Sequence, residues 1–482
     1  MRRRNWFVLV PACCFLVLSL LLTTGLVPAP PLATRIDDLL QRWQVDQAFW
    51  GIAVYDLDAD RMLYSRNAKQ SFLPASNQKI LTSATALDVL GSTHRYETTL
   101  YYNGDADGSI MRGDLILDGS GDPTFGSSQV RGEDPLQAWA QKLADMGVER
   151  IEGRLIGDDN AFDDRPYPDG WTVNYITEQK GRHMGNSVGA LAYRDNVVPV
   201  IVRATRPGAP PNVEVQPKDA VSITNKATTS SRWRGNTLQV NRTFSTNELV
   251  LTGSVARSYN GSLAVPVSDP TPFVLRSFVR RLEEAGIETD LTLTDIDDLN
   301  ERPDRGSPLF VEFSRPLAEI VAVMNKESDN FYAEQIFRSY GWGGSTKGAA
   351  RRTKSFLREA DINTRQLLIH DGSGLSRKDL ITPEAMVKLL AHMNEHKARE
   401  AFMASLPSGG ERNTTLDYRL HRTNVKAKTG SLEFVRALSG YVRRPNGHRV
   451  AFAVFANNYT GPSYQISRTI DDIVRSVASM AS

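Results

Sequence analysis

Ser76 and Lys79 are separated by three positions in a stretch with helical apolar spacing, and the chain has no other Ser-x-x-Lys. On a helix, residues three apart share a face, so the lysine amine can reach the serine hydroxyl. Serine becomes a good nucleophile when a base removes its proton, and lysine can be that base if burial or a nearby cation lowers its pKa. The pair is compatible with a serine hydrolase, although an exposed Ser and Lys would give the same pattern.

Two further motifs lie in the last third of the chain. Ser328-Asp329-Asn330 falls between two predicted helices, where the alternative role is a helix cap. Lys428-Thr429-Gly430 is the only Lys-(Ser/Thr)-Gly, and it ends a predicted strand. Gly430 allows another backbone to approach closely, and the strand edge can pair with an extended peptide; a plain strand-to-turn exit is the alternative.

The three motifs together, in the order Ser-Lys, Ser-Asn and Lys-Thr-Gly, resemble those of the penicillin-binding proteins and serine β-lactamases. The resemblance implies an α+β fold, in which an antiparallel sheet is flanked by helices. It also implies catalysis through a serine acyl-enzyme, with no metal and no organic cofactor.

Within this superfamily, the chain most resembles the class C low-molecular-mass penicillin-binding proteins, which are D-alanyl-D-alanine carboxypeptidase/endopeptidases. Residues 77–327 are long enough for the large insertion of this branch. Residues 119–123 (Gly-Ser-Gly-Asp-Pro), 371–377 (Asp-Gly-Ser-Gly-Leu-Ser-Arg) and 428–432 (Lys-Thr-Gly-Ser-Leu) also match. The resemblance implies hydrolysis of peptidoglycan stem peptides or cross-links beside D-Ala, with β-lactams as covalent inhibitors.

The resemblance assigns the reacting groups to the first two motifs. Ser76 attacks the carbonyl between two D-amino acids, and Lys79 accepts its proton. Ser328 relays that proton to the leaving amine, and Asn330 binds the amide on the acyl side.

The third motif is expected to bind substrate. Lys428 keeps Lys79 neutral by like-charge repulsion and, with Thr429, attracts the terminal carboxylate. Gly430 gives the substrate backbone room. The backbone N–H groups of Ser76 and Ser431 form the oxyanion hole.

Two residues outside the motifs are candidates for the rest of the stem peptide. Arg377 would recognise an acidic group and Asp158 an amino group; a surface salt bridge and a solvated or capping carboxylate are the alternatives. The chain departs from the family at Asp379, where Asn is usual, and at Glu433-Phe434, where small residues are common. A ring at residue 434 can narrow the cleft, which affects substrate preference more than chemistry.

Apolar periodicity predicts the elements that position these residues. Expected helices are 37–45, 76–90, 272–285, 317–327, 331–340, 348–359, 383–393 and 463–480. Expected strands are 51–57, 62–65, 96–102, 114–117, 151–156, 197–202, 237–240, 248–255, 425–428, 437–442 and 450–456. We therefore expect a catalytic domain from 34–92 plus 305–482, an insertion domain from 93–164 plus 251–304, and an inner β-rich domain from 165–250.

The N-terminus and the composition indicate where the protein acts. Residues 1–33 open with three arginines and continue with an apolar run, as in a signal peptide or an uncleaved anchor. Export to the periplasm or cell envelope follows, with peripheral or anchored membrane association left open. Both cysteines, Cys13 and Cys14, lie in this run, so the body has no thiol for a disulfide or a nucleophile. A net charge of +2 argues against nucleic-acid binding.

Three other functions fit parts of the sequence. A serine β-lactamase would use the same scaffold, and a non-catalytic cell-wall-binding protein would keep only its shape. His392-x-x-Glu395-His396 matches an inverted zinc-peptidase motif, although a polar helix end gives the same pattern.

Overall fold

A computed structural model describes residues 30–130, 132–177, 185–218, 220–233, 235–244 and 246–480. The predicted signal or anchor, 1–33, lies almost entirely outside these residues, although helix α1 (Leu32–Leu40) already begins inside it. Among the described residues, no helix combines the length and the apolar character that crossing a membrane requires.

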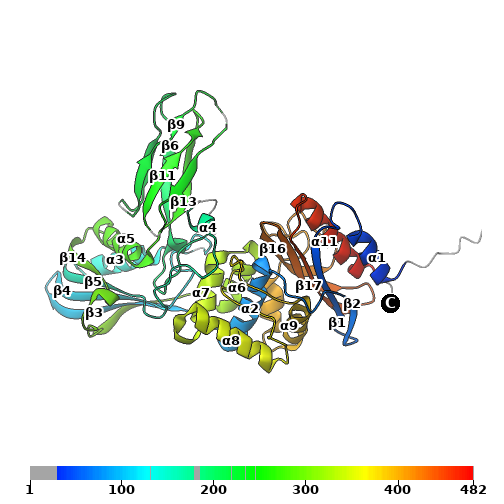
Figure 1. The fold of residues 1–482 in the computed structure, drawn as a ribbon. Coiled ribbons are helices and arrows are strands. Elements are labelled where there is room, and N and C mark those ends of the chain that lie inside the picture. Colours follow the sequence, from blue (N-terminus) through cyan, green and yellow to red (C-terminus); the bar gives the residue numbers. More distant parts are fainter. Residues whose placement is uncertain are drawn as a thin grey trace, which may run out of the picture.

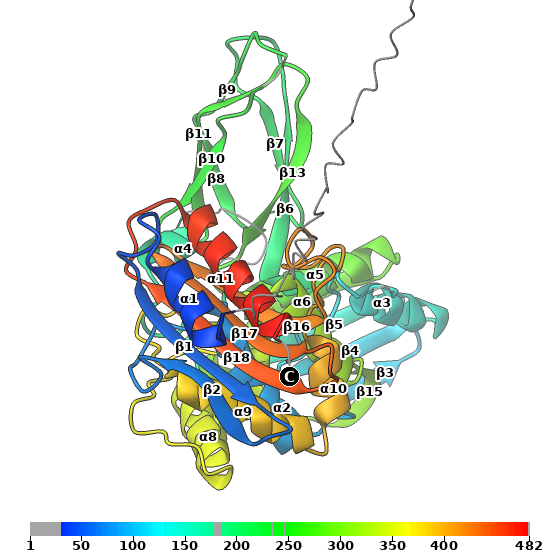
Figure 2. The same cartoon turned by 90° about the vertical axis from the view of Figure 1, so that its right-hand side faces the viewer.

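A five-stranded antiparallel sheet forms the centre of one part of the molecule (Figure 1). Its strands, in spatial order, are β16 (Val425–Leu432), β17 (Val435–Arg443), β18 (Arg449–Asn457), β1 (Phe49–Asp56) and β2 (Arg61–Arg66). Helices α1 and α11 (Ser463–Ala478) cover one face, as Figure 2 shows, and bury Ile36, Ile470 and Val474 against it.

The opposite face carries the helices that hold the serine motifs. These are α2 (Gln78–Val89), α6 (Leu317–Glu327), α7 (Asn330–Ser339), α8 (Thr346–Glu359), α9 (Pro383–Glu395) and α10 (Arg399–Ser405). Their apolar residues share one buried cluster with the sheet, in which α9 packs on β1, β17 and β18. The predicted α+β architecture, an antiparallel sheet flanked by helices, is confirmed.

A second sheet lies to the other side of α6 and α7 (Figure 1). Its strands, in spatial order, are β14 (Glu288–Asp295), β5 (Arg150–Asp158), β4 (Ile110–Gly119), β3 (Glu97–Asp107) and β15 (Ser307–Phe313). Helices α3 (Pro135–Asp145) and α5 (Pro270–Glu284) bury Trp139 and Phe278 against it. Because β15 pairs with β3, residues 307–313 belong with this sheet and not, as expected, with the catalytic part that was placed from residue 305.

Short strands build a module that projects from the body (Figures 1 and 2). They are β6 (Val197–Arg203), β7 (Asn212–Val215), β8 (Ser222–Asn225), β9 (Thr228–Thr229), β10 (Gln239–Arg242), β11 (Glu248–Thr252), β12 (Ser254–Val255) and β13 (Asn260–Pro266). Since β13 pairs with β6 over its whole length, the module extends past the expected end at residue 250.

Candidate active site

Ser76 sits in a single 3₁₀ turn, η1 (Ala75–Asn77), that leads into α2. The residue before it, Ala75, is buried and has φ +47°, a left-handed conformation that costs a non-glycine residue energy and is found at functional sites. Two glycines make room for this turn. A side chain at Gly374 would collide with the Ala75 carbonyl, and one at Gly430 would meet Pro74 and Asn77. The half-buried Ser76 is thus held in a tight backbone cradle.

Lys79 lies one turn into the helix and is fully buried. Its Nζ donates to Ser76 Oγ (3.1 Å), to Asn330 Oδ1 (2.7 Å) and to the Ser373 carbonyl (2.8 Å). Burial lowers the pKa of Lys79 to about 8, against the opposing pull of nearby carboxylates. An amine with this pKa is neutral often enough near neutral pH to take a proton from a serine.

Ser328 and Asn330 come from the joint between α6 and α7. Ser328 ends α6 with φ +63°, a left-handed cap that turns the chain, and Asp329 caps α7 by accepting from Tyr332 N. Asn330, the first residue of α7, is 6% exposed and faces Lys79. The capping role and the site role of this motif therefore coexist.

Lys428 lies on β16 and is buried like Lys79. Its Nζ donates to Ser328 Oγ (2.9 Å), and its carbonyl accepts from Asn77 Nδ2 (3.0 Å). Burial, followed by repulsion from Lys79, lowers the pKa of Lys428 well below its usual value.

The rest of the third motif continues along the same strand. The sequence predicted that Lys428-Thr429-Gly430 ends a strand. β16 instead runs on to Leu432, so the motif lies within the strand. Thr429 is 8% exposed and Ser431 is exposed. β16 is an edge strand, because β17 is its one neighbour in the sheet. A bridge between Ser408 and Lys426 covers the start of this edge, and the motif lies beyond it, beside η1.

The structure brings the motif residues into one hydrogen-bonded group. Lys79 joins Ser76 to Asn330, Lys428 joins Ser328 to the strand, and Asn77 joins the strand to the turn that holds Ser76. Two half-buried hydroxyls thus lie next to two buried amines.

Three buried carboxyl groups lie behind this group, and the sequence analysis did not predict their role. Glu334 on α7 accepts from the backbone N–H groups of Gly372 and Ser373, which fixes the carbonyl that binds Lys79. Burial raises the pKa of Glu334 to about 8. The Asp-Gly-Ser-Gly-Leu-Ser-Arg motif indicated that this loop belongs to the site. No motif or spacing indicated that Glu334 contacts the loop.

Asp371 and Asp379 form a buried carboxyl pair. Asp371 accepts from Gly374 N and Ser376 N, each at 2.7 Å, and from Trp171 Nε1 at 2.9 Å. Asp379 accepts from His370 N through one oxygen, while its other oxygen has no donor. Burial and the neighbouring Asp371 raise the pKa of Asp379 well above its usual value. A protonated Asp379 can donate to Asp371, as the amide of Asn would at this position.

Arg377 lies near the site, whereas Asp158 does not belong to the hydrogen-bonded group. The exposed Arg377 guanidinium donates to the Glu433 carbonyl, two residues after Ser431 (3.3 Å and 3.4 Å). Asp158 ends β5 in the second sheet, is 3% exposed at its side chain, and pairs with Arg305 at 2.6 Å. Phe434 is 48% exposed in the turn between β16 and β17.

The histidines of the zinc-peptidase motif lie at the end of α9. His396 caps the helix and its Nε2 lies 3.1 Å from Asp88, while the His392 ring packs edge-on against Phe356. Among the described residues, two clusters have a geometry that can hold a cation, and neither includes these histidines or a predicted site residue. They are Asp56 with Asp58 and His448, and Asp159 with Asp295 and Asp297.

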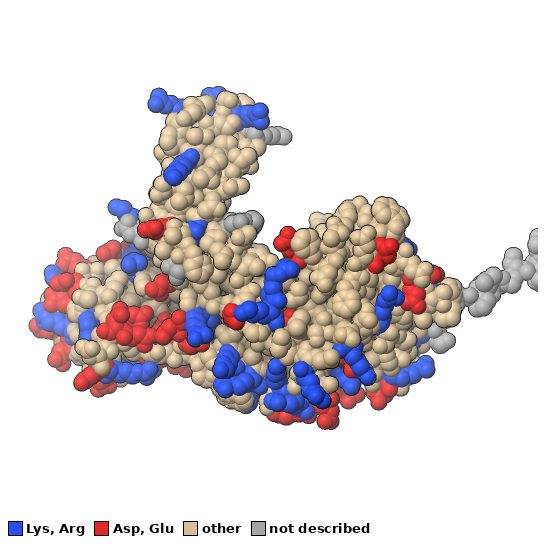
Figure 3. All heavy atoms as spheres, in the orientation of Figure 1, with Lys and Arg blue, Asp and Glu red and all other residues tan. Residues whose placement is uncertain are grey.

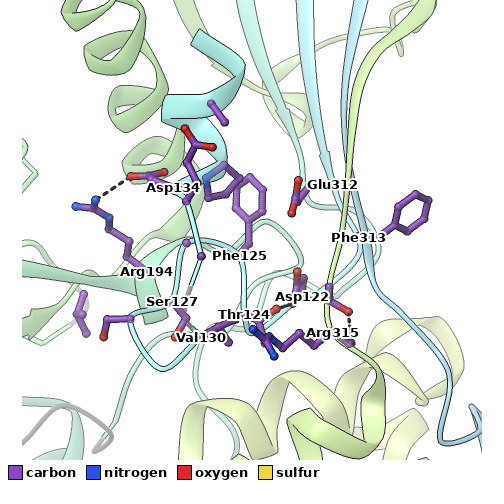
Figure 4. Close-up of a pocket in the computed structure, with 18 of the residues that line it drawn as sticks. Asp122, Thr124, Phe125, Ser127, Val130, Asp134, Arg194, Glu312, Phe313 and Arg315 are labelled. Atoms are coloured by element: carbon purple, nitrogen blue, oxygen red, sulfur yellow. Dashed lines mark hydrogen bonds and ion pairs between the residues drawn. The ribbon is translucent and has the colours of Figure 1, made fainter. Parts of the chain in front are cut away.

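A separate cavity of about 860 Å³ lies beside the second sheet (Figure 4). Asp122, Phe125 and Arg315 line it, together with the base of the projecting module, and none of the predicted site residues does. The loop along its wall touches α7, because Tyr332 donates to Ser127 Oγ (3.0 Å). Ser127 therefore links the wall of the cavity to α7, and the cavity does not reach the serine group.

Comparison with known proteins identifies relatives over the whole described chain. A model of the D-Ala-D-Ala carboxypeptidase 3 (S13) family matches residues 32–478. A D-alanyl-D-alanine carboxypeptidase of Actinomadura sp. (strain R39) is 30% identical over 454 residues, which cover 89% of this chain and 81% of that protein.

Solved structures share the fold. The crystal structure of penicillin binding protein 4 (dacB) from Haemophilus influenzae aligns with a TM-score of 0.78 at 24% identity, covering 92% of this chain and 99% of that one. A structure of the same protein complexed with a novel β-lactam aligns with a TM-score of 0.74 at 23% identity and equal coverage.

Proposed function

The chain belongs to the D-Ala-D-Ala carboxypeptidase 3 (S13) family and is a serine-type D-Ala-D-Ala peptidase, and we propose that Ser76 is its nucleophile. The observation that carries this proposal is the contact between Ser76 Oγ and the buried amine of Lys79. The substrate class is the peptidoglycan stem peptide, cut as a carboxypeptidase, as an endopeptidase, or both.

Acylation starts at the Ser76–Lys79 pair. Neutral Lys79 takes the hydroxyl proton as Ser76 attacks the D-Ala carbonyl. The backbone N–H groups of Ser76 and Ser431 stabilise the oxyanion. Loss of one such donor raises the activation barrier by about 3 kcal/mol. As the C–N bond breaks, Ser328 donates its hydroxyl proton to the leaving amine and receives in its place the proton that Lys79 has taken. The 2.9 Å contact with Lys428 Nζ orders the Ser328 hydroxyl. Water then hydrolyses the ester.

Substrate binding uses the edge of β16. An extended peptide can add to that edge beside Gly430, and Asn330 binds the amide on the acyl side. Lys428 and Thr429 attract the terminal carboxylate. No metal or organic cofactor takes part in these steps.

Arg377 extends the proposed site toward an acidic group of the stem peptide. Its position beside the end of β16 supports this role, whereas the pairing of Asp158 with Arg305 removes the support for Asp158 as the amino-group partner. Arg377→Gln is expected to raise KM about tenfold for a stem peptide with a free carboxylate there, while penicillin acylation stays unchanged; Arg61→Gln, on the β1–β2 hairpin, serves as the control.

We further infer that the protein is exported and that β-lactams acylate Ser76. The H. influenzae relative was solved with a β-lactam, and peptidoglycan lies outside the cytoplasm. Cleavage of residues 1–33 as a signal, a periplasmic location and membrane association of that segment stay proposals. So does the division into a catalytic domain and two insertions, with boundaries moved to the strand pairs given above.

A muropeptide digest tests the proposed function. Incubation with monomeric and cross-linked muropeptides, followed by mass spectrometry, should show loss of terminal D-Ala, cleavage of cross-links, or both. A β-lactamase would instead leave muropeptides intact and turn over a chromogenic cephalosporin rapidly. A non-catalytic binding protein would do neither.

A further inference from the structure

The far end of the projecting module is formed by the chain segments 204–211, 226–233, 235–238 and 253–258, which we call the tip. Backbone hydrogen bonds join them: Thr229 N donates to the Ala209 carbonyl (2.8 Å), and Arg257 N donates to the Arg232 carbonyl (2.9 Å). β9 and β12 also pair there. Figures 1 and 2 both show β9 at the end of the projection, away from the two large sheets.

The tip carries positive charge without any compensating carboxylate. Its segments contain Arg206, Lys226, Arg232 and Arg257 and have no Asp or Glu. Arg206, Lys226, Arg232 and Arg257 are exposed. On the face drawn in Figure 3, the end of the module shows Lys and Arg alone among charged residues. The whole chain has a net charge of only +2, so this end differs from the average surface.

An exposed indole completes the tip. Trp233 is 66% exposed, and the Arg257 guanidinium lies 5.2 Å from its ring centroid. The neighbouring acidic residues of the module lie on its strands, where Glu214 is already paired with Arg203 (2.9 Å). The tip thus places a large apolar ring beside exposed cations, and no ion pair is seen for these cations among the described residues of the tip.

We propose that the tip docks onto the anionic lipid headgroups of a membrane surface. Arginine matches phosphate geometry, and tryptophan favours the headgroup level of a bilayer, where its ring is half in contact with apolar chains. Because the tip projects, it reaches a flat surface without the body colliding. A hydrated anionic polymer of the wall would use the arginines but leave the indole without an apolar partner.

The test measures hydrogen exchange of the full chain by mass spectrometry. A local readout is needed because the apolar N-terminal segment can bind lipid by itself, and only a local readout separates its binding from that of the tip. Vesicles containing phosphatidylglycerol should slow exchange in residues 204–211, 226–233 and 235–238. Pure phosphatidylcholine vesicles should not, and added salt should reverse the effect.

Charge reversal at the tip provides the variant. Arg232→Glu with Arg257→Glu should raise the phosphatidylglycerol concentration needed for half-maximal protection of the tip at least about tenfold. The reason is that each charge near an anionic surface contributes roughly 1 kcal/mol to binding. Hydrolysis of a soluble D-Ala-D-Ala peptide should stay unchanged, which shows that the variant is folded. Arg351→Glu with Arg352→Glu, at the other Trp–Arg cluster around Trp342, is the matched control and should leave tip protection intact.

Three outcomes would overturn the proposal. They are an unprotected tip, protection confined to α8 around Trp342, and tip protection by a soluble anionic wall polymer in place of vesicles.

Discussion

Lys79 Nζ lies 3.1 Å from Ser76 Oγ, and the Lys79 side chain is fully buried. The same burial that brings the amine to the hydroxyl lowers its pKa to about 8. Burial of Lys79 therefore accounts both for the position of its amine and for its lowered proton affinity. A serine and a lysine on an exposed helix face would have the spacing without the altered pKa.

The pH dependence of acylation follows from this shift. Only neutral Lys79 can accept the Ser76 proton, so the rate constant for acylation by penicillin should rise with pH and level off above about pH 8. Below that point it should fall about tenfold per pH unit. Stopped-flow acylation from about pH 6 to about pH 9.5 measures this, and a rate independent of pH across the range would contradict Lys79 as the base.

Ser328 is expected to affect chemistry more than binding. Its hydroxyl touches Lys428 and not Lys79 directly, so Ser328→Ala removes the relay while leaving the Ser76–Lys79 pair in place. We expect kcat on a D-Ala-D-Ala peptide to fall about 10²–10⁴-fold, with KM nearly unchanged. Ser339→Ala, on the same helix as Asn330, is the control. A loss confined to KM would argue against the relay.

Lys428 should distinguish substrates by their terminal carboxylate. Lys428→Met removes the charge but keeps the length of the buried side chain, and should lower kcat/KM for a peptide with a free carboxylate about 10–100-fold. The loss for a peptide ending in an amide should be clearly smaller. Equal losses on both substrates would mean that Lys428 acts on the fold or on Ser328 and not on the carboxylate.

The buried Asp379 carboxyl leads to a prediction for how the stability of the protein depends on pH. A buried acid whose folded pKa is raised stabilises the fold at pH values below its unfolded pKa of 3.8, and that stabilisation is lost as pH rises toward the folded pKa. Glu334, with a pKa of about 8, acts in the same direction. Wild-type protein should therefore become less stable between about pH 4 and pH 8.

Asp379→Asn should reduce this pH dependence and raise the free energy of unfolding at pH 8 by about 1–3 kcal/mol, because the amide donates permanently to Asp371. Urea unfolding at acidic and alkaline pH measures it. Asp379→Ala, the control, should destabilise the protein at both. If Asp379→Asn lowered stability at pH 8, the shared-proton arrangement would be wrong.

The sequence predicted which motif residues would lie together better than it predicted their surroundings. Ser76, Lys79, Ser328 and Lys428 were identifiable because each motif fixes residue types at short spacing. Asp379 stood out only as a departure from the family, and its partner Asp371 could not be assigned, since the contact depends on how the 371–379 loop folds back on itself. The role of Glu334 was invisible for the same reason.

The secondary structure was likewise predicted well for some elements and poorly for others. Helices with a strong apolar face, such as α6, matched their predicted bounds, whereas α3 was missed within a region that was expected to be mostly strands. Strands β13 and β15 were also missed, because Gly261 and Pro266 in β13 and Pro308 in β15 weaken the strand signal. Their pairing with β6 and β3 moved the expected boundaries, which only long-range contacts determine.

The central claim is that Ser76 forms the acyl-enzyme, and labelling with a fluorescent penicillin tests it most directly. Peptide mass spectrometry should find the adduct on Ser76 in wild-type protein, and Ser76→Ala should take up no label while keeping its unfolding midpoint. A label on any other residue, or unchanged labelling of Ser76→Ala, would contradict the account.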